Sequence, residues 1–271
     1  EHIYEVMMKG INKLGGKCDG IGVSTAGVIV NDRPMVSSLF IKVPKKDFEL
    51  VKGAYINAVK RISDELGYDI PYSVANDGDV TALAGALDLK DNCVLGIAMG
   101  TSEAVGYVNE DGNLTGWLNE LAFMPVDFNI DAMKDEWSGD FGVGCKYFSQ
   151  DAVIKLAPRA GIELDESLTL AEKLKVVQKS NEEGHEGANK IFETIGTYLA
   201  YTLAFYAEFY KIKHVLLLGR VVSGKGGDTI LSVCKEVFKK EFKEYAGIDI
   251  GMPSEYMRRV GQSIAAASLS E

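Results

Sequence analysis

The sequence predicts an α/β protein. Short apolar segments typical of strands alternate along the chain with longer segments whose apolar residues recur at helical spacing. The 271 residues are enough to bury a large core, in one two-lobed domain or in two compact ones. Hydrophobic residues make up 46% of the chain and charged residues 25%, which is ordinary for a soluble globular protein.

The first 90 residues are predicted to contain three helices and two strands. Apolar side chains at helical spacing predict a helix over residues 3–14, and an apolar segment predicts a strand over residues 21–30. A second helix over residues 47–66 is ended by a glycine. A short strand over residues 71–75 then leads into an alanine-rich helix over residues 76–86.

The middle of the chain is predicted to hold two strands and a long irregular segment. Residues 92–107 are predicted to form two strands joined by a Gly-Thr-Ser turn at 100–102, and a hairpin turn follows at 110–113. Residues 118–148 contain a proline and three glycines, which predict loops and short strands. Such a long irregular segment within a compact domain is often functional.

The last part of the chain is predicted to be mainly helical. Two or three helices lead to a long helix at about 186–211, whose apolar residues cover most of its circumference and so indicate burial. A continuous apolar strand at 214–218 is followed by a glycine-rich loop at 219–227 and a helix at 228–240. A final helix is predicted at 254–269.

The ends and the net charge of the chain limit the classes of function. The chain begins inside its first predicted helix, with neither an initiator Met nor a signal-peptide pattern, so we expect a further segment upstream. No apolar run approaches the ~18 residues needed to span a bilayer. The net charge of −10 disfavours a nucleic-acid-binding face, because phosphate neutralisation needs clustered Lys and Arg. Small anionic ligands remain possible, since backbone amides and helix N-termini bind them.

Cysteine and histidine usage argues against a metal site. The four cysteines, Cys18, Cys93, Cys145 and Cys234, are widely spaced and form no Cys-x-x-Cys pair. This pattern favours a reduced cytoplasmic compartment, four buried structural thiols and no zinc site. The three histidines have no metal-ligand spacing and leave little for a Ser-His-Asp or Cys-His mechanism.

Three junctions between a predicted strand and the following turn place polar or glycine residues where open α/β sheets bind ligands. At the first junction, Asn76 and Asp77 follow a short strand and open a helix. Asp77 can act as a general base on an alcohol, and Asn76 can hydrogen-bond the neighbouring hydroxyl groups. Either residue could instead only cap the helix. Asp79 is a weaker candidate, because its place in the first turn suits the helix dipole.

The second junction is the turn Gly100-Thr101-Ser102 between two predicted strands. Its backbone N–H groups and hydroxyl groups can cradle a phosphate. A hairpin turn that binds no ligand is an equally good interpretation of so short a motif.

The third junction joins a buried strand, a glycine-rich loop and a helix at residues 218–227, which is typical of an anion or nucleotide site. It nearly matches a P-loop, with Gly219, Gly224 and Lys225 correctly spaced. However, Gly226 stands where a Ser or Thr should bind magnesium. A glycine loop that only turns the chain is the remaining alternative.

Six segments, taken together, resemble the ROK family of bacterial sugar kinases and sugar-responsive repressors. Residues 20–27 resemble the family's GIGVPG strand, residues 76–84 its NDANAAALAE segment and residues 96–101 its second phosphate segment. Residues 119–126 resemble its GEIGHMPV segment, residues 216–223 its adenosine segment VLGGGVS and residues 259–267 its final RLGAALAA. The matches keep the family's order across essentially the whole chain.

The resemblance implies two ribonuclease-H-like lobes of the actin-like ATPase fold, with sugar and ATP meeting in the cleft. Residues 1–90 would form a small lobe, residues 91–255 a large lobe, and the helix at 256–271 would return to the small lobe. The family's first phosphate segment, an Asp-x-Gly-Gly-Thr hairpin, would precede residue 1. The N-terminal strands of the small lobe are therefore expected to be missing from this chain.

The resemblance also implies roles on the sugar side. Asp77 would take the proton from the sugar hydroxyl that attacks the γ-phosphate. Asn76 and Glu120 would hydrogen-bond other hydroxyl groups of the sugar. Phosphoryl transfer depends more on positioning and charge stabilisation than on covalent chemistry, which agrees with these roles.

On the nucleotide side, the resemblance implies that the turn Gly100-Thr101-Ser102 faces the phosphates. Gly219 and Arg220 would lie on the adenosine side. ATP is the expected phosphoryl donor, and Mg²⁺ is expected to bridge its phosphates.

Three positions depart from the family pattern. Phe123 replaces the histidine of GEIGH, and the cysteine cluster that normally follows is absent, with residues 137–142 in its place. These two departures agree with each other and predict a branch without structural zinc. Arg220 replaces a second glycine of the adenosine segment, which predicts a reshaped nucleotide site.

The leading functional prediction is an ATP-dependent kinase of a hexose or hexose derivative. Its expected partners are a sugar and a nucleotide, with no nucleic acid and no membrane, and it is expected to be a cytoplasmic homodimer. The chief alternative is a non-catalytic sugar-binding domain of a ROK-type transcription regulator. A base at Asp77 favours the kinase, whereas loss of the histidine and cysteines favours the regulator or a changed substrate. A P-loop NTPase that uses Lys225 is a third alternative.

Overall fold

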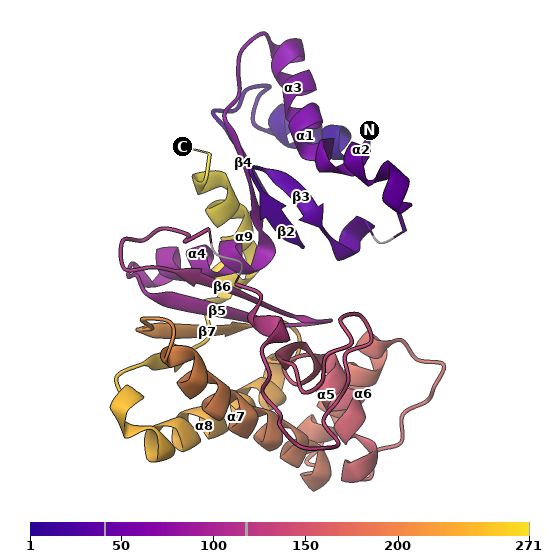
Figure 1. Ribbon diagram of the computed structural model, residues 1–271, viewed down its shortest axis with the longest axis vertical. Coiled ribbons are helices and arrows are strands. Elements are labelled where there is room, and N and C mark those ends of the chain that lie inside the picture. Colours follow the sequence, from indigo (N-terminus) through magenta and orange to yellow (C-terminus); the bar gives the residue numbers. More distant parts are fainter. Residues whose placement is uncertain (41, 117–118, 271) are drawn as a thin grey trace.

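The computed structural model describes residues 1–40, 42–116 and 119–270 (Figure 1). Its largest described sheet has four strands in the order β6-β5-β7-β8. These strands are β5 (Val94–Met99), β6 (Glu103–Val108), β7 (His214–Leu218) and β8 (Asp249–Gly251). β5 runs antiparallel to β6 and parallel to β7, and β8 runs parallel to β7.

Two smaller sheets lie in the N-terminal part of the molecule (Figure 1). β1 (Ile21–Thr25) pairs in parallel with β4 (Tyr72–Asn76), and β2 (Val28–Val30) pairs antiparallel with β3 (Arg33–Val36). The predicted α/β class is therefore confirmed. The division of the chain near residue 90 stays a prediction.

The described helices cover both faces of the four-stranded sheet. Helix α4 lies on one face and α7 and α8 lie on the other (Figure 1). The C-terminal helix α9 packs against α4 and β1. The helices are α1 (His2–Lys13), α2 (Phe48–Lys52), α3 (Ala54–Leu66), α4 (Asp77–Leu89), α5 (Gln150–Leu156), α6 (Leu170–Glu182), α7 (Glu186–Ala207), α8 (Gly224–Glu241) and α9 (Glu255–Ser268). No described helix combines the length and the apolar character needed to cross a bilayer.

Strand β5 is buried on both faces, which explains its continuous apolar sequence. Leu95 and Ile97 belong to the main core, together with buried side chains of α7 and α8. Val94, which points to the other face, packs in a second cluster with alanines of α4. β5 and its neighbour β7 are the two inner strands of the sheet and lie between the helices on its two faces.

The structure corrects several predicted boundaries. The segment predicted as one strand at 21–30 is two strands, because Gly27 adopts a φ of +111° and breaks the pairing. β3, predicted only as a turn, contains Pro34, which a short two-stranded sheet tolerates. The predicted helix at 47–66 is interrupted at Gly53. The prediction also omitted β8.

In the C-terminal half, α7 ends at Ala207 and not near residue 211, and α8 begins at Gly224 and not at residue 228. All four cysteines are free thiols. Cys18 is partly exposed, so the prediction of four buried thiols is wrong at that residue.

The N-terminus of α4 lies directly on β6, and two glycines permit this contact. A Cβ added to Gly106 would lie 2.1 Å from the carbonyl oxygen of Gly78, and a Cβ added to Gly78 would lie 2.5 Å from the carbonyl oxygen of Val105. Because backbone stands on both sides, neither contact can be relieved by a side-chain movement.

We therefore expect Gly106→Ala to lower the free energy of unfolding by about 1–3 kcal/mol, as overpacking does. Gly10→Ala is the matched control, because Gly10 is exposed inside α1 with no atom within 4 Å of the added Cβ. That variant should be more stable by about 0.5–1 kcal/mol. Urea unfolding of the two variants and the wild type measures both effects, and equal stability of all three would contradict the packing argument.

Candidate active site

Asn76 ends β4 and caps α4. Its Oδ1 accepts from the backbone N–H of Gly78 at 2.7 Å, and its Nδ2 donates to the carbonyl oxygen of Gly27 at 2.7 Å. The capping interpretation of Asn76 is thus confirmed. An amide side chain has two donor hydrogens and two acceptor lone pairs, so one of each remains for a ligand.

Asp77 is the first residue of α4 and is half-buried. Its Oδ1 accepts from the backbone N–H of Gly78 at 3.1 Å, and no described side chain forms an ion pair with it. Burial raises the pKa of Asp77, although the hydrogen bond from Gly78 acts in the opposite direction. A carboxylate with a raised pKa and no cationic partner is a suitable proton acceptor.

Asp79 connects α4 to the segment that carries Glu120. Its Oδ1 accepts from Nδ2 of Asn119 at 3.0 Å, and the Tyr210 hydroxyl donates to Oδ1 of Asn119 at 3.1 Å. Burial raises the pKa of Asp79 to about 6, and the charges of Glu120 and Asp77 add to this effect. From the sequence, Asp79 was predicted as a weaker candidate for the base, because its place suits the helix dipole, and no role was assigned to Asn119.

Glu120 lies at the rim of the site. Its side chain is open to solvent, yet partial desolvation and the charge of Asp77 both raise its pKa. The structure therefore brings Asp77, Asp79 and Glu120 close enough to repel one another, from two segments that are 40 residues apart. Three acidic groups and two amides form one polar cluster beside the start of α4.

The two predicted nucleotide segments lie next to each other. β5 and β7 are parallel neighbours, so the turn Gly100-Thr101-Ser102 and the Gly219 turn leave the same edge of the sheet. The backbone N–H of Val221 donates to the carbonyl oxygen of Met99 at 3.1 Å. A Cβ added to Gly219 would lie 2.2 Å from that same oxygen.

The Gly100 turn borders open space, although the Gly100 N–H already donates to the carbonyl oxygen of Ser102 at 3.0 Å. A Cβ added to Gly100 would have its nearest neighbour 3.9 Å away, and Thr101 and Ser102 are exposed. Arg220 is exposed next to this turn, and its carbonyl oxygen accepts from Ser223 Oγ at 2.6 Å. The exposed Thr101 and Ser102, next to this open space, suit a phosphate chain.

The structure does not support the P-loop alternative. Lys225 lies in the first turn of α8, but its Nζ donates to the carbonyl oxygen of Asn181 at 3.1 Å. Gly226 and Gly227 are buried, and a Cβ on Gly227 would lie 2.0 Å from the Val222 carbonyl oxygen. These glycines allow close packing rather than anion binding.

Glu103 is a buried carboxyl group that sequence reasoning missed. It opens β6 directly after the Gly100 turn, is only 5% exposed, and neither of its carboxyl oxygens has a hydrogen-bond partner. Burial raises its pKa to about 8, so it is mainly protonated at neutral pH. A Cβ added to Gly144 would lie 2.4 Å from its Oε2, which shows how tightly the irregular segment covers it.

No three His, Cys, Asp or Glu side chains lie close enough to hold a metal ion in residues 1–40, 42–116 and 119–270. Phe123, at the family's histidine position, instead packs beside a small buried cluster. That cluster consists of Ala122, Val143 and Cys145.

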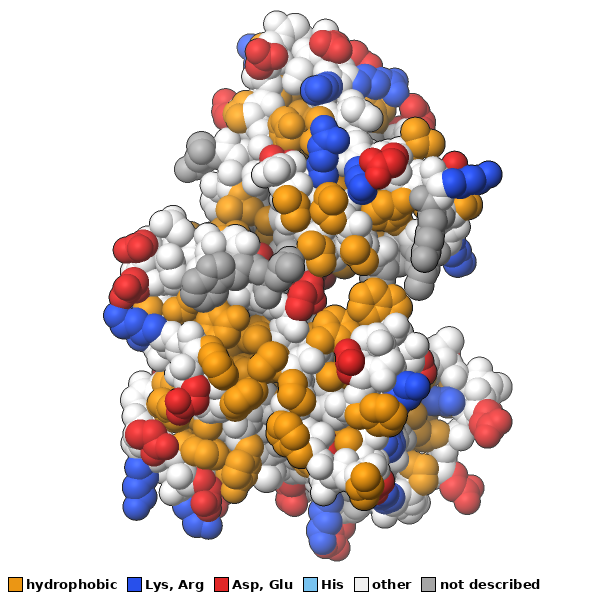
Figure 2. Space-filling model, in the orientation of Figure 1, with side chains coloured by type: hydrophobic (Ala, Val, Ile, Leu, Met, Phe, Trp, Pro, Cys, Tyr) orange, Lys and Arg blue, Asp and Glu red, His pale blue; other side chains and the backbone are white. Residues whose placement is uncertain are grey.

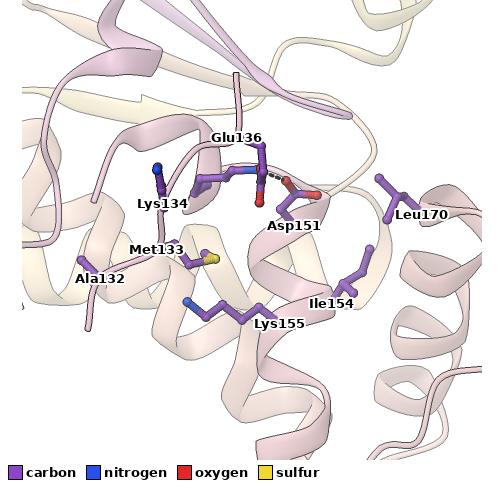
Figure 3. Close-up of a pocket in the computed structure, with 9 residues that line it drawn as sticks. Ala132, Met133, Lys134, Glu136, Asp151, Ile154, Lys155 and Leu170 are labelled. Carbon is purple, nitrogen blue, oxygen red and sulfur yellow. Dashed lines mark hydrogen bonds and ion pairs between the residues drawn. The ribbon is translucent and has the colours of Figure 1, made fainter. Parts of the chain in front are cut away.

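The molecule is hollowed between its N-terminal part and the four-stranded sheet, with hydrophobic and acidic side chains at the edge of the hollow (Figure 2). A separate pocket of about 610 Å³ lies against α5 (Figure 3). Met133 and Lys134 lie on one side of it and Ile154 and Leu170 on the other (Figure 3). None of the predicted site residues lines this pocket.

No family model and no curated protein sequence matches this chain. The fold, in contrast, matches solved structures over almost its whole length. A ROK hexokinase from Thermus thermophilus aligns with a TM-score of 0.74 at 16% identity, over 98% of this chain and 83% of that one. The chain has the fold of the ROK proteins.

Two other ROK structures show the same likeness. A glucokinase from Streptomyces griseus in complex with glucose and AMPPNP aligns with a TM-score of 0.66 at 16% identity, over 99% of this chain and 87% of that one. A ROK transcriptional regulator, a homologue of the E. coli MLC protein, aligns with a TM-score of 0.69 at 13% identity, over 99% of this chain and 67% of that one. The resemblance inferred from six sequence segments is thus confirmed at the level of the fold.

Glu103 leads to a stability prediction. The pKa of Glu103 is raised from 4.5 to about 8 in the folded state. Between these two pH values the folded protein keeps the carboxyl proton, whereas the unfolded protein has lost it. The free energy of unfolding should therefore fall as pH rises from about 4.5 to about 8, by about 4 kcal/mol. Glu103→Gln should remove this part of the pH dependence.

Urea unfolding at pH 5, 6.5 and 8 measures the difference between Glu103→Gln and the wild type. Glu166→Gln, at an exposed position, is the matched control and should follow the wild-type profile. Parallel profiles for all three proteins would show that Glu103 is ionised or hydrated in the folded state.

Proposed function

We propose that this protein is an ATP-dependent kinase of a hexose or hexose derivative, with Asp77 as the catalytic base. The observation that carries the proposal is the position of Asp77. It is half-buried, has a raised pKa and lies beside Asn76 and Glu120 at the start of α4, in a fold shared with ROK hexokinases and glucokinases.

In the proposed reaction, Asp77 accepts the proton of the attacking sugar hydroxyl. The sugar oxygen forms a bond to the γ-phosphorus while the bond from that phosphorus to the β-phosphate oxygen breaks, and ADP leaves. Asn76 and Glu120 orient the sugar through its other hydroxyl groups. Asp79 and Asn119 hold the two halves of the sugar site at a fixed separation through their hydrogen bond.

The turn Gly100-Thr101-Ser102 would bind the phosphates of ATP, and Gly219 and Arg220 would border the adenosine. The open space beside Gly100 and the exposed Thr101 and Ser102 support this role. We expect Mg²⁺ to bind mainly through the nucleotide phosphates, because no three His, Cys, Asp or Glu side chains of the described residues are placed to hold a metal ion. The ion would neutralise charge as the phosphoryl group moves.

A second candidate is a sugar-binding domain without catalysis. Its support is the likeness to the ROK transcriptional regulator, together with Phe123 at the family's histidine position. A pure sensor, however, needs no carboxylate with a raised pKa at position 77, so the kinase is the better-supported function.

The test is Asp77→Asn. This substitution keeps the shape of the side chain and removes its basicity, so we expect ADP release to fall at least 100-fold while sugar affinity changes less than tenfold. Coupled ADP assays with magnesium-ATP and a panel of hexoses and amino sugars measure turnover, and calorimetry measures binding.

Asp64→Asn, at an exposed position on α3, is the matched control and should keep wild-type turnover. Undiminished turnover of Asp77→Asn would exclude Asp77 as the base. Sugar binding without ADP release from the wild type, for every sugar, would identify a sensor instead of a kinase.

A further inference from the structure

The irregular segment after Glu120 presents an exposed tryptophan on an ordered turn. Trp137 is 65% exposed. The turn is closed by backbone hydrogen bonds from Gly139 to Asp135 at 2.9 Å and from Asp135 to Asp140 at 2.8 Å. The Asp135 carboxylate, which is only 7% exposed, also accepts from the backbone N–H of Ser138 at 2.7 Å. The backbone that carries the indole is therefore held in place by these hydrogen bonds.

An ion cluster around Lys146 includes two residues of this turn, and Glu136 and Asp151 of the cluster are drawn in Figure 3. Lys146 Nζ lies 2.5 Å from Glu136, 2.8 Å from Asp151 and 3.6 Å from Asp135. Burial would raise the pKa of Asp135, but the hydrogen bonds from Ser138 and the charge of Lys146 hold it below its ordinary value. A half-buried lysine and a buried aspartate thus hold the backbone of the turn that carries the exposed Trp137.

Trp137 lies against Phe123, and Phe123 is tied to the sugar site. The two ring centroids are 5.4 Å apart, with an angle of 40° between the rings. Phe123 belongs to the short 3-10 turn Leu121–Phe123, and its backbone N–H donates to the carbonyl oxygen of Glu120 at 3.0 Å. The aromatic pair therefore has a fixed position just beyond Glu120.

The chemistry of this pair suits a carbohydrate ring. A pyranose has apolar C–H faces and a rim of hydroxyl groups, and aromatic rings next to a few polar groups are typical of sites that bind such ligands. The indole N–H of Trp137 makes no hydrogen bond to any described residue, so it can donate to a sugar hydroxyl. Burying the exposed indole would add hydrophobic stabilisation.

We propose that Phe123 and Trp137 form a second sugar subsite, so that the substrate of this protein is a disaccharide whose outer ring packs on Trp137. Asn76, Asp77 and Glu120 then hold the ring that is phosphorylated. The inference rests on the proposed sugar site, and it assigns a binding role to the segment that replaces the family's cysteine cluster.

The first test uses fluorescence and needs no turnover. The sequence contains two tryptophans, Trp117 and Trp137, so the variant Trp117→Phe emits only from Trp137. We expect maltose, cellobiose or sucrose to shift this emission to shorter wavelength with saturable dependence on concentration, and glucose to leave it unchanged. Unaltered emission with all three disaccharides would overturn the second subsite.

The second test separates the outer ring from the reacting ring. For a disaccharide that is phosphorylated, Trp137→Ala should raise KM about three- to tenfold, the size of one lost stacking contact. The KM for glucose should change less than twofold. Trp137→Phe keeps a stacking face and should restore most of the affinity. Phe141→Ala, another exposed aromatic of the same segment, is the matched control and should have no effect on KM.

The two tests distinguish failure of this inference from failure of the kinase proposal. A Trp137 emission shift with a disaccharide, but no ADP release from any sugar, would support the subsite and reject the kinase. Equal changes in KM for glucose and the disaccharide in Trp137→Ala would reject the subsite and leave the kinase standing.

Discussion

The contact of α4 with β6 is the constraint on which the site depends. Gly78 and Gly106 meet with no side chain between their backbones, so the start of α4 lies closer to the sheet than two ordinary residues would allow. Since Asn76, Asp77 and Asp79 belong to or adjoin this first turn, the same contact sets how far their side chains stand from the Gly100 turn and from the segment around Glu120. The functional geometry is thus a consequence of helix-to-sheet packing.

The site combines acidity with partial burial. Asp77, Asp79 and Glu120 all have raised pKa values, and no lysine or arginine pairs with any of them among the described residues. Glu103 is a further carboxyl group, buried beneath the irregular segment. Such groups lower stability, because each would be better solvated in the unfolded chain. Proteins tolerate this cost mainly where a function requires it.

Much of the fold and part of the site could be predicted from the sequence. The apolar strands at 94–99 and 214–218 and the polar residues after them carry local signals, and parallel pairing places their ends at one edge. The Asn76-Asp77 pair was chosen as a candidate because it too directly follows a short strand. Contacts between distant segments left no such signal.

The hydrogen bond between Asp79 and Asn119 and the ring contact between Phe123 and Trp137 depend on how loops fold back onto the sheet. Periodicity cannot reveal this. The buried state of Glu103 was equally hidden, because an acidic residue at the start of a strand is usually assigned to the surface. The start of α8 was misplaced because its glycines indicated a loop, whereas tertiary packing makes them helical.

The covering of β1 by α9 has a consequence for how the protein is made. A Cβ on Gly22 would lie 1.6 Å from the carbonyl oxygen of Ala266, so these two backbones touch although they stand near opposite ends of the sequence. On the ribosome, β1 is synthesised more than 200 residues before the helix that covers it. One face of the sheet that contains β1 therefore stays uncovered over that interval, exposed to chaperones and proteases until α9 is released.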